Sequence, residues 1–411
     1  MPDGMLIIGA GECGARAALA LRDGGYDGPV ALVGHEPHLP YERPPLSKDA
    51  MVSEAEPSPK LVCERQFFVD RRIDCVTGAR AISIDRAVRS ITLADGRTLP
   101  YDKLLLTTGA MPRQLPLPGT DGSRCAYLRT HDDALRIRGA LKPDSRIAIL
   151  GGGFIGLEIA ASARRRGARV TVIEALPRIL TRGVPEEIAC VIDARHRDEG
   201  VTLACGKGVS ALRETASAIE IALSDGSSVA ADLLIIGIGA VPVTDLAQKA
   251  GLAIENGIAV DDQLRTSDPD IYAAGDCCSF PLAIYGGRRV RLECWRNAQD
   301  QGALAARNML GAGESASAVP WFWSDQYDLT LQIAGLPDEG KRAVRRDLSE
   351  SAFILFHLAS DGRLVAASGI ARGNGVAKDI RLAEMLIAKG TRPDPAALAQ
   401  PQVKLKSLLA A

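Results

Sequence analysis

Two glycine-rich turns carry the residues with the most specific chemistry in this chain. The first runs from Gly9 to Gly14 (GAGECG) and the second from Gly151 to Gly156 (GGGFIG). Both fit G-x-G-x-x-G. In that motif the first glycine allows a tight turn, the second lets a pyrophosphate approach the backbone, and the third lets the next helix pack closely. Each turn therefore predicts a dinucleotide-binding site.

An acidic residue follows each turn at the distance such sites require. Glu36 and Glu174 each stand at the end of a predicted strand, about 20 residues after the glycines, where a carboxylate accepts hydrogen bonds from a ribose. A carboxylate pairs with a free ribose 2′-hydroxyl but repels a 2′-phosphate. Glu174 thus favours NADH over NADPH at the second site, although Arg178 would partly offset its charge.

The elements that must position these residues are present on both sides of each turn. Apolar strands precede the turns at 6–8 and 146–150, and helical patterns follow at 15–22 and 157–166. Second strands follow at 29–34 and 169–173. A glycine cluster alone is common in turns, whereas two complete strand–turn–helix–strand–acid segments are specific. The chain is therefore expected to bind two nucleotides.

Each nucleotide-binding segment closes with an apolar strand that ends at a glycine. These strands are 103–109 and 233–237, and their nearly continuous apolar character is typical of the buried centre of a parallel sheet. The stretch 266–276 then predicts a strand that ends in Gly275 and Asp276. Asp276 is a candidate for binding a sugar or ribityl hydroxyl, with an ordinary turn-capping role as the alternative. This order predicts that the second segment is inserted into the first.

The predicted fold class is α/β, with two Rossmann-like dinucleotide-binding domains and a C-terminal α+β domain. The proline-rich run 112–118 and the small-residue run 311–317 are expected to be linkers. The predicted domains are 1–110 with 240–318, then 111–239, then 319–411.

The last part of the chain begins near Pro320 and contains two tryptophans at alternate positions, Trp321 and Trp323. This spacing is more typical of the buried face of a strand than of an electron-transfer path. Strands are expected at 329–333, 353–358 and 364–368, with a helix at 377–389.

Composition excludes several function classes. The formal net charge of -1 gives no basic field for nucleic acid. No apolar run approaches the ~20 residues that span a bilayer, and the first strand begins too early to leave room for a signal peptide. The nine cysteines form no C-x-x-C pair, which argues against a disulfide framework or a metal site. A cytoplasmic enzyme with reduced thiols is expected.

Four stretches give the chain a recognisable family pattern: 41–48 (YERPPLSK), 151–158, 266–276 and 320–327. With them, essentially the whole chain resembles the oxygenase-coupled NADH-dependent ferredoxin reductases, a branch of the glutathione-reductase-like flavoproteins. The resemblance implies that the first segment binds FAD and the second binds NADH. It also implies hydride transfer from NADH to FAD, followed by single-electron transfer to a [2Fe-2S] ferredoxin. That ferredoxin, of the Rieske or the plant and adrenodoxin type, would serve a Rieske dioxygenase or a cytochrome P450 in aromatic hydrocarbon catabolism.

The same resemblance implies site residues. Lys48 would lie near the flavin ring, and Glu158 would help to orient Lys48 or the nicotinamide; these two are the catalytic candidates. From the residues alone, the proline-rich loop that holds Arg43 and Lys48 fits a surface connector equally well. FAD would contact Gly9, Gly11, Cys13, Gly14, Glu36, Arg43, Lys48, Ala81, Arg129, Asp276 and Trp295. NADH would contact Gly151, Gly153, Phe154, Ile155, Gly156, Glu174, Arg182 and Gly239.

Cysteines are missing where related enzymes use them. Disulfide reductases of this class carry C-x-x-x-x-C soon after the first acidic residue, and NADH peroxidases carry one cysteine there, but 37–62 contains none. The adjacent Cys277 and Cys278 are expected to be packing residues. The chain also departs from the family at Cys13, where alanine is usual, and at Val243, where asparagine is common. A disulfide substrate is therefore not expected.

Two other functions fit the same residues. One is an NADH oxidase or quinone reductase, and the other is a slowly turning flavoprotein that senses redox state. Arg288, Arg289 and Arg291 are candidates for docking an acidic ferredoxin, although a solvated charge run explains them equally well. The sequence leaves open whether the protein is a monomer or a homodimer.

Overall fold

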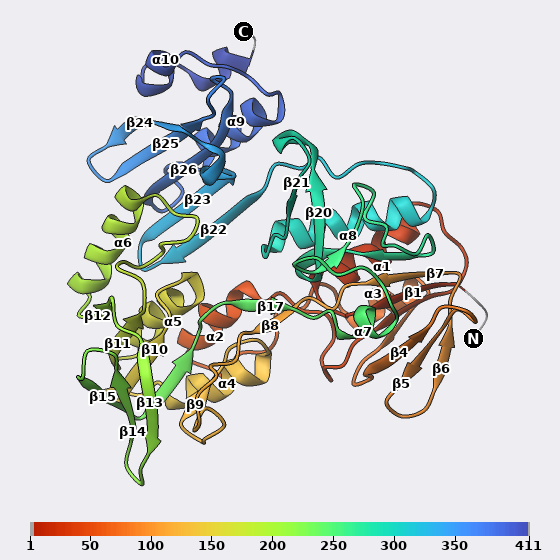
Figure 1. The fold of residues 1–411 in the computed structure, drawn as a ribbon, viewed down its shortest axis with the longest axis horizontal. Helices are drawn as coiled ribbons and strands as arrows, with labels where there is room; N and C mark the ends of the chain where they lie inside the picture. The colour runs from red at the N-terminus through yellow and green to blue at the C-terminus, as the bar shows by residue number, and fades with distance from the viewer. Residues whose placement is uncertain (1–3, 410–411) are drawn as a thin grey trace. The chain divides into compact units, whose positions relative to one another are not determined.

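The computed structural model describes residues 4–409, which divide into two compact units (Figure 1). Unit 1 comprises Met1–Glu42, Pro59–Met111 and Val241–Ala318, and unit 2 comprises Arg43–Ser58, Pro112–Ala240 and Val319–Ala411. Two of the boundaries fall in short strands, β8 (Ala110–Pro112) and β17 (Ala240–Pro242). The chain thus leaves unit 1 and returns to it, as the predicted insertion requires.

Unit 1 is built on a five-stranded parallel sheet of order β19-β7-β1-β2-β3. The returning strand β19 lies beside β7, so the chain completes the first sheet only after the inserted part. The strands are β1 (Met5–Ile8), β2 (Val30–Val33), β3 (Ile73–Val76), β7 (Lys103–Leu106) and β19 (Ile271–Ala273).

Helices α1 (Glu12–Asp23) and α8 (Trp295–Met309) pack against each other in unit 1. A Cβ atom added at Gly302 would lie 2.3 Å from the Cys13 carbonyl oxygen, so the helices approach most closely at the start of α1. A second, antiparallel sheet contains β4 (Ala81–Asp85), β5 (Ser90–Leu93) and β6 (Thr98–Pro100). The smaller elements are α3 (Arg65–Asp70), α7 (Asp245–Lys249), β18 (Ile258–Ala259), η2 (Gly275–Cys277), β20 (Cys278–Leu282), η3 (Ala283–Tyr285) and β21 (Arg288–Val290).

Unit 2 contains a second five-stranded parallel sheet, of order β12-β11-β10-β16-β9. A three-stranded antiparallel sheet, β13-β14-β15, accompanies it. The parallel strands are β9 (Cys125–Ala126), β10 (Arg146–Leu150), β11 (Arg169–Glu174), β12 (Thr202–Cys205) and β16 (Leu233–Ile236); the antiparallel ones are β13 (Val209–Glu214), β14 (Ile219–Leu223) and β15 (Ser228–Ala231). The helices are η1 (Pro44–Ser47), α2 (Asp49–Val52), α4 (His131–Ala140), α5 (Phe154–Arg165) and α6 (Glu186–Asp198).

The C-terminal part of unit 2 is an antiparallel sheet of order β22-β23-β26-β25-β24 with helix α9 packed on it. The elements of this C-terminal part are β22 (Trp321–Gln326), β23 (Leu329–Gly335), η4 (Pro337–Glu339), β24 (Arg342–Ser349), β25 (Ala352–Leu358), β26 (Leu364–Arg372), α9 (Ala377–Ala388), α10 (Pro395–Ala399) and η5 (Leu405–Leu409).

Within residues 4–409, no helix combines the length and the apolar composition that crossing a membrane requires.

The predicted fold class is confirmed, with two parallel Rossmann-like sheets and a C-terminal α+β part. The stretch 73–85 forms two strands, β3 and β4, because Gly78 turns the chain between them with a φ of 68°. Helix α8 begins at Trp295, and its polar first turns give only a weak helical period in the sequence. Helix α4 and strand β24 were not predicted. The division into three domains remains a prediction.

The expectation that Trp321 and Trp323 mark a buried face was wrong. Both rings are half-exposed and stack with centroids 5.4 Å apart, whereas Ser324 and Gln326 on the same strand are buried. Strand β22 is one of the two edge strands of its sheet, and its polar face turns inward. The reason for this inversion is the buried Glu158 carboxylate, to which Ser324 donates a hydrogen bond.

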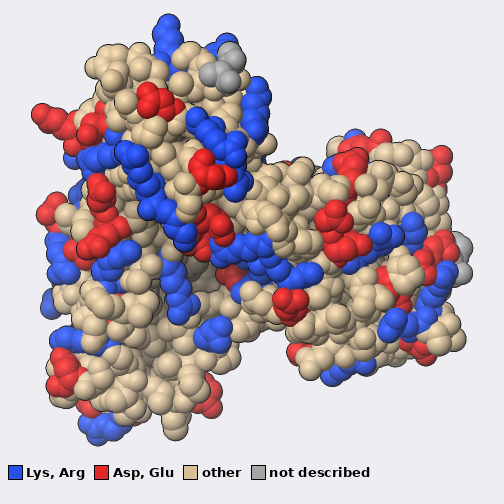
Figure 2. Space-filling model, turned by 45° about the horizontal axis from the view of Figure 1, so that its top comes forward, with Lys and Arg blue, Asp and Glu red and all other residues tan. Residues whose placement is uncertain are grey.

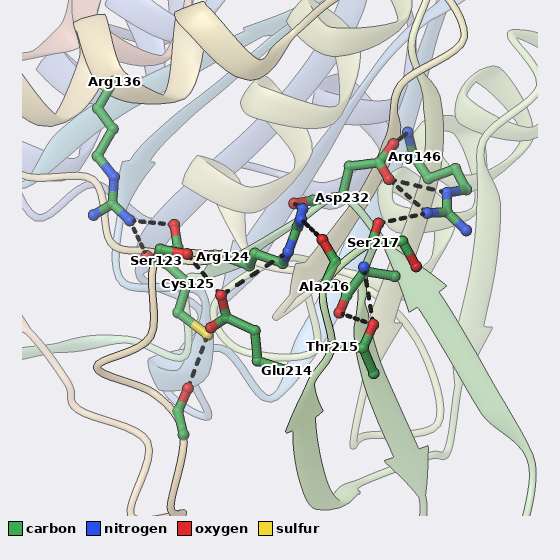
Figure 3. Close-up of polar contacts among 12 residues, drawn as sticks. Ser123, Arg124, Cys125, Arg136, Arg146, Glu214, Thr215, Ala216, Ser217 and Asp232 are labelled. Carbon is green, nitrogen blue, oxygen red and sulfur yellow. Dashed lines mark hydrogen bonds and ion pairs between the residues drawn. The ribbon is translucent and has the colours of Figure 1, made fainter.

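Arginines join the three-stranded antiparallel sheet β13-β14-β15 of unit 2 to the parallel sheet (Figure 3). Arg146 Nη2 donates to Asp232 Oδ1 at 2.6 Å, and its backbone N–H donates to Oδ2 at 2.8 Å. Arg124 donates to the Ala216 carbonyl oxygen at 2.9 Å and to the Asp232 carbonyl oxygen at 3.2 Å. These contacts fix where β15 passes into β16, the strand that closes the nucleotide-binding sheet.

Replacing Asp232 with Asn should lower the stability of unit 2 by about 0.5–1 kcal/mol, a small value because solvent screens half-exposed ion pairs. The Arg146 hydrogen bonds hold the pKa of Asp232 below its usual range. A lowered pKa contributes stability above the unfolded-state value and loses it as the pH falls through the folded-state value. The difference between Asp232→Asn and wild type in thermal unfolding should therefore be full at pH 7 and shrink below about pH 4.

Candidate dinucleotide and charge-relay site

The first glycine turn is closed so tightly that side chains are excluded. Gly9 has a φ of 119°, and a Cβ atom there would lie 2.1 Å from the Thr107 carbonyl oxygen. A Cβ atom at Gly14 would lie 2.0 Å from the Gly9 carbonyl oxygen. A Cβ atom at Gly11 would meet no described atom within 4 Å. Two glycines thus serve packing, while Gly11 leaves open space beside the turn.

The second turn repeats this geometry. Gly151 has a φ of 110°, and a Cβ atom there would lie 2.3 Å from the Gly237 carbonyl oxygen. A Cβ atom at Gly156 would lie 2.2 Å from the Gly151 carbonyl oxygen, whereas one at Gly153 would meet none of the described atoms within 4 Å. Gly237 and Thr107, which directly follow the closing strands β16 and β7, were not predicted as site residues. Their signal was the position directly after each apolar strand.

The N-termini of α1 and α5 meet the requirements of a pyrophosphate site. Gly11 and Gly153 are the residues before the first helical positions, and no side chain among residues 4–409 hydrogen-bonds there as a cap. Their first-turn N–H groups and the positive ends of the helix dipoles attract an anion. The open glycines and the uncapped helices fit a dinucleotide at each turn.

The acidic residues after the turns are held by their surroundings. Tyr41 donates its hydroxyl hydrogen to Glu36 at 2.5 Å. Glu174 accepts from the Gly152 N–H at 2.7 Å and from the Leu176 N–H at 2.8 Å, one on each carboxylate oxygen. Glu174 is therefore fastened to the glycine turn, with its remaining lone pairs available to ribose hydroxyls.

Arg178 is held by the loop that follows β11. Its guanidinium donates to the carbonyl oxygens of Ile179, Leu180 and Val184, at 3.0–3.1 Å. These bonds hold the loop after β11 in place. The donors of Arg178 are thereby used within its own loop, and the partial offset of the Glu174 charge by Arg178 remains a prediction.

Asp276 follows the strand β19 in the short helix η2, next to Cys13 and Gln301. A Cβ atom at Gly275 would lie 3.3 Å from Cys13 Sγ, and Gln301 Oε1 accepts from the Gly275 N–H at 2.7 Å. Gln301 also accepts from Cys278 Sγ at 3.4 Å. These contacts bring the end of the returning strand beside the first glycine turn. Gln301 was not predicted, because nothing in its local pattern marks it.

The cysteines around this turn are packing residues. Cys277 and Cys278 are fully buried and Cys13 nearly so. Burial raises the pKa of each of these three thiols. A thiol with a raised pKa stays protonated, and the nucleophilic form is the thiolate. The expectation that Cys277 and Cys278 are packing residues agrees with this environment.

The two catalytic candidates form an ion pair within unit 2. Lys48 Nζ lies 3.1 Å from Glu158 Oε1, and its ammonium lies over the Trp323 ring, 5.5 Å from the centroid. Glu158 is 5% exposed. Ser47 donates to Glu158 Oε2 at 2.5 Å, and Ser324 donates to Oε1 at 2.6 Å. The carboxylate therefore has three donors, and this explains the inward polar face of β22.

The other predicted contacts are distributed over both units. Arg43 donates to the Arg129 carbonyl oxygen at 2.5 Å, so these two residues meet in unit 2. Arg182 is exposed in the loop after β11, and Ala81 begins β4 in the separate antiparallel sheet. The remaining positions are Trp295, the first residue of α8; Phe154 and Ile155, in the first turn of α5; and Gly239, before β17.

The arginines considered for docking are partly committed elsewhere. Arg289 donates to the carbonyl oxygens of Ser279 and Val260, at 2.7 and 3.0 Å, and Arg291 pairs with Glu293. Lys and Arg are mixed with Asp and Glu across the visible face of the molecule (Figure 2). These observations do not favour Arg289 and Arg291 as a dedicated docking patch.

Comparison with family models places most of the chain in two known families. Residues 4–302 match the pyridine nucleotide-disulphide oxidoreductase family, and residues 321–409 match the reductase C-terminal family.

Similar proteins cover the whole chain. The ferredoxin–NAD(+) reductase component of the anthranilate 1,2-dioxygenase system of Burkholderia cepacia is 42% identical over 410 residues, which is 99% of each protein. The crystal structure of the ferredoxin reductase for the CYP199A2 system from Rhodopseudomonas palustris matches with a TM-score of 0.93 and 36% identity, covering 98% of this chain and 99% of that one.

A third match is the reductase in the covalent putidaredoxin reductase–putidaredoxin complex. It has a TM-score of 0.93 and 32% identity, and the match covers 100% of this chain and 98% of that one. The two glycine turns lie in the part of the chain matched to the first family model, and the buried polar face of β22 lies in the part matched to the second. The chain belongs to the pyridine nucleotide-disulphide oxidoreductase family, with a reductase C-terminal domain.

Proposed function

We propose that this protein is an FAD-dependent NADH:ferredoxin oxidoreductase. The observation that carries the proposal is the presence of two complete dinucleotide turns in one chain that also holds the buried Lys48–Glu158 pair. The cysteines near the first turn are buried and protonated, which disfavours disulfide chemistry. Relatives named ferredoxin–NAD(+) reductases support the ferredoxin as electron acceptor.

The overall reaction is the oxidation of one NADH by two ferredoxins, which gives NAD⁺, one proton and two reduced ferredoxins. Bound FAD supplies the change from two-electron to one-electron transfer that neither substrate can make. The protein holds the two dinucleotides, and we assign the pyrophosphates to the uncapped N-termini of α1 and α5. Glu36 and Glu174 bind ribose hydroxyls at the two sites.

Lys48 and Glu158 supply charge rather than a nucleophile. A carboxylate that accepts from Ser47 and Ser324 and pairs with Lys48 keeps the ammonium at a fixed position. Preorganised charge of this kind stabilises charge that develops during transfer without reorganisation at the moment of reaction. We propose that the pair would supply this charge to the flavin and the nicotinamide when both cofactors are bound.

The second site should prefer NADH strongly. Glu174→Ala removes the carboxylate that repels a 2′-phosphate, and it also removes the hydrogen bonds that Glu174 accepts from the Gly152 and Leu176 N–H groups. We expect the affinity for NADH to fall about tenfold and the affinity for NADPH to stay within about twofold. The ratio of the NADH affinity to the NADPH affinity should therefore become smaller. Titration of each variant with both cofactors measures this ratio. An unchanged ratio would contradict the assignment of Glu174, and Arg213→Ala, at an exposed surface pair, is the control.

The proposal includes a [2Fe-2S] ferredoxin as the partner, a downstream Rieske dioxygenase or cytochrome P450, and a cytoplasmic location. The names of the relatives support a ferredoxin partner, and they support a downstream dioxygenase or cytochrome P450 through the anthranilate 1,2-dioxygenase and CYP199A2 systems. The reduced-thiol composition supports the third.

Steady-state NADH consumption tests the proposed function. The FAD-loaded protein is assayed with and without a [2Fe-2S] ferredoxin, with cytochrome c as the final acceptor. Strong stimulation by ferredoxin is expected. Equal consumption with oxygen alone would support an NADH oxidase or quinone reductase, and almost no consumption would support a redox-sensing flavoprotein.

A further inference from the structure

A chain of buried hydrogen bonds extends from Glu158 to a residue on α6. Ser324 donates to Glu158, Gln326 Nε2 lies 3.2 Å from Ser324 Oγ, and Gln326 Oε1 lies 2.8 Å from His196 Nε2. Ser324, Gln326 and His196 are 2%, 3% and 0% exposed. The outer end is Tyr327, whose hydroxyl oxygen lies 3.4 Å from His196 Nδ1. All of these residues belong to unit 2.

The chemistry of these groups fixes which group donates and which accepts at each hydrogen bond of this series. Burial lowers the pKa of His196, so the ring is neutral and carries a single N–H. Gln326 Oε1 can only accept, so that hydrogen is on Nε2, and Gln326 must donate its own amide hydrogen to Ser324 Oγ. Because Ser324 Oγ accepts this hydrogen bond, the single hydroxyl hydrogen of Ser324 is donated to Glu158.

The direction matters because a hydroxyl group is otherwise free to rotate. Without Gln326, the Ser324 hydroxyl could donate elsewhere or accept from another group. The amide donor removes this freedom, so the carboxylate oxygen that pairs with Lys48 always receives the same second donor. Buried networks of this kind fix geometry when every member is satisfied.

We propose that Ser324 and Gln326 are positioning residues for electron transfer, which act by fixing the Glu158 carboxylate and, through it, the Lys48 ammonium. This inference rests on the proposed function, in which the Lys48–Glu158 pair serves the reduction of bound FAD by NADH. Neither residue needs to touch a cofactor. His196 holds the amide of Gln326 in the orientation that the chain requires.

The experiment compares Ser324→Ala, Gln326→Met and the double variant in the FAD-loaded protein. Thr330→Val is the matched control, because Thr330 is a buried polar residue on the neighbouring strand whose hydroxyl donates to Asp325 Oδ1, at 2.8 Å, and not to a member of the hydrogen-bond series. Three quantities are measured: the limiting rate of flavin reduction by NADH, the apparent Kd for NADH, and the flavin midpoint potential. Thermal unfolding is recorded for each variant.

Each single variant should slow the limiting rate about tenfold while the Kd for NADH stays within about twofold. Both should move the midpoint potential in the same direction. The double variant should be no slower than either single variant, because residues that act in one chain are not additive. Thr330→Val should keep the wild-type rate. If Gln326→Met does not fold, Gln326→Glu keeps the shape, removes the amide donor and should show the same slowing.

A purely structural role predicts a different result. The inference would be overturned if Ser324→Ala and Gln326→Met lowered only the thermal stability and kept the rate and the midpoint potential of Thr330→Val. It would also be overturned if the effects of the two substitutions on the rate were fully additive in the double variant. If the wild-type flavin is not reduced by NADH at all, the proposed function itself fails. These outcomes are distinguishable because the wild-type measurement comes first.

Discussion

Replacing Gly153 with Ala should weaken NADH binding about a hundredfold, which is about 2.7 kcal/mol, without destabilising the apoprotein. A Cβ atom at this position meets no atom of residues 4–409 within 4 Å, so the fold accepts it. The same atom would occupy the space through which a pyrophosphate reaches the N–H groups of α5. Titration with NADH and thermal unfolding of the apoprotein measure the two effects separately. FAD content should remain at the wild-type level, because the first turn is untouched.

The matched variant is Gly156→Ala, three residues further along the same turn. Its Cβ atom would lie 2.2 Å from the Gly151 carbonyl oxygen and 3.3 Å from Ile149 Cγ2, and a backbone oxygen cannot move aside. We expect a loss of about 3 kcal/mol of stability. The turn would have no specific role in binding if both variants lowered the stability equally and each folded molecule still bound NADH with the wild-type affinity.

Replacing Lys48 with Met should destabilise unit 2 by about 3 kcal/mol, since it leaves the buried Glu158 carboxylate without its counter-ion. The Ser47 and Ser324 hydroxyls would still donate, but two hydroxyl groups do not replace a full charge. The double variant Lys48→Met with Glu158→Gln removes both charges and should recover most of the lost stability. Thermal unfolding of the wild type, both single variants and the double variant completes the cycle.

Flavin reduction separates this structural effect from the proposed chemistry. The double variant should fold well and still be reduced by NADH about tenfold more slowly than wild type, because the positioned charge is gone. Recovery of the rate together with stability would show that the pair serves only the fold. Stability of Lys48→Met equal to that of the wild type would show that the pair contributes little to the stability of the fold.

Much of the fold could be predicted because its signals are local. Each Rossmann-like segment consists of an apolar strand, a glycine turn and a helix that follow one another in the sequence. The positions of β1, α1, β10 and α5 could therefore be predicted close to where the structure has them. The antiparallel parts were harder to predict. Strand β24 alternates exposed and buried residues with arginines among them, and such patterns give weak periodicity.

The candidate site was predictable only where one segment supplies it. The glycines and acids lie in the motif itself, but the close contacts that require them come from the carbonyl oxygens of Thr107 and Gly237. The partners of Glu158 come from two segments far from it in the sequence, one that carries Ser47 and Lys48 and one that carries Ser324. No local pattern links such residues.

The face of β22 shows the same limit in another form. From sequence, Trp321 and Trp323 had the apolar character of a buried face. The buried charge on α5 instead draws Ser324 and Gln326 inward, because a buried carboxylate without donors is far more costly than a half-exposed aromatic ring. Tertiary electrostatics, rather than local hydrophobicity, decided which face of the strand is buried.

The most direct measurement of the central claim is a single turnover without oxygen. The FAD-loaded protein is reduced with one equivalent of NADH and mixed rapidly with an oxidised [2Fe-2S] ferredoxin, while the absorbance of the flavin and of the ferredoxin is followed. We predict that the flavin is reoxidised as two ferredoxins are reduced for each FAD, with matching rates. A flavin that stays reduced in the presence of ferredoxin, and is reoxidised only when air is admitted, would contradict the assignment as a ferredoxin reductase.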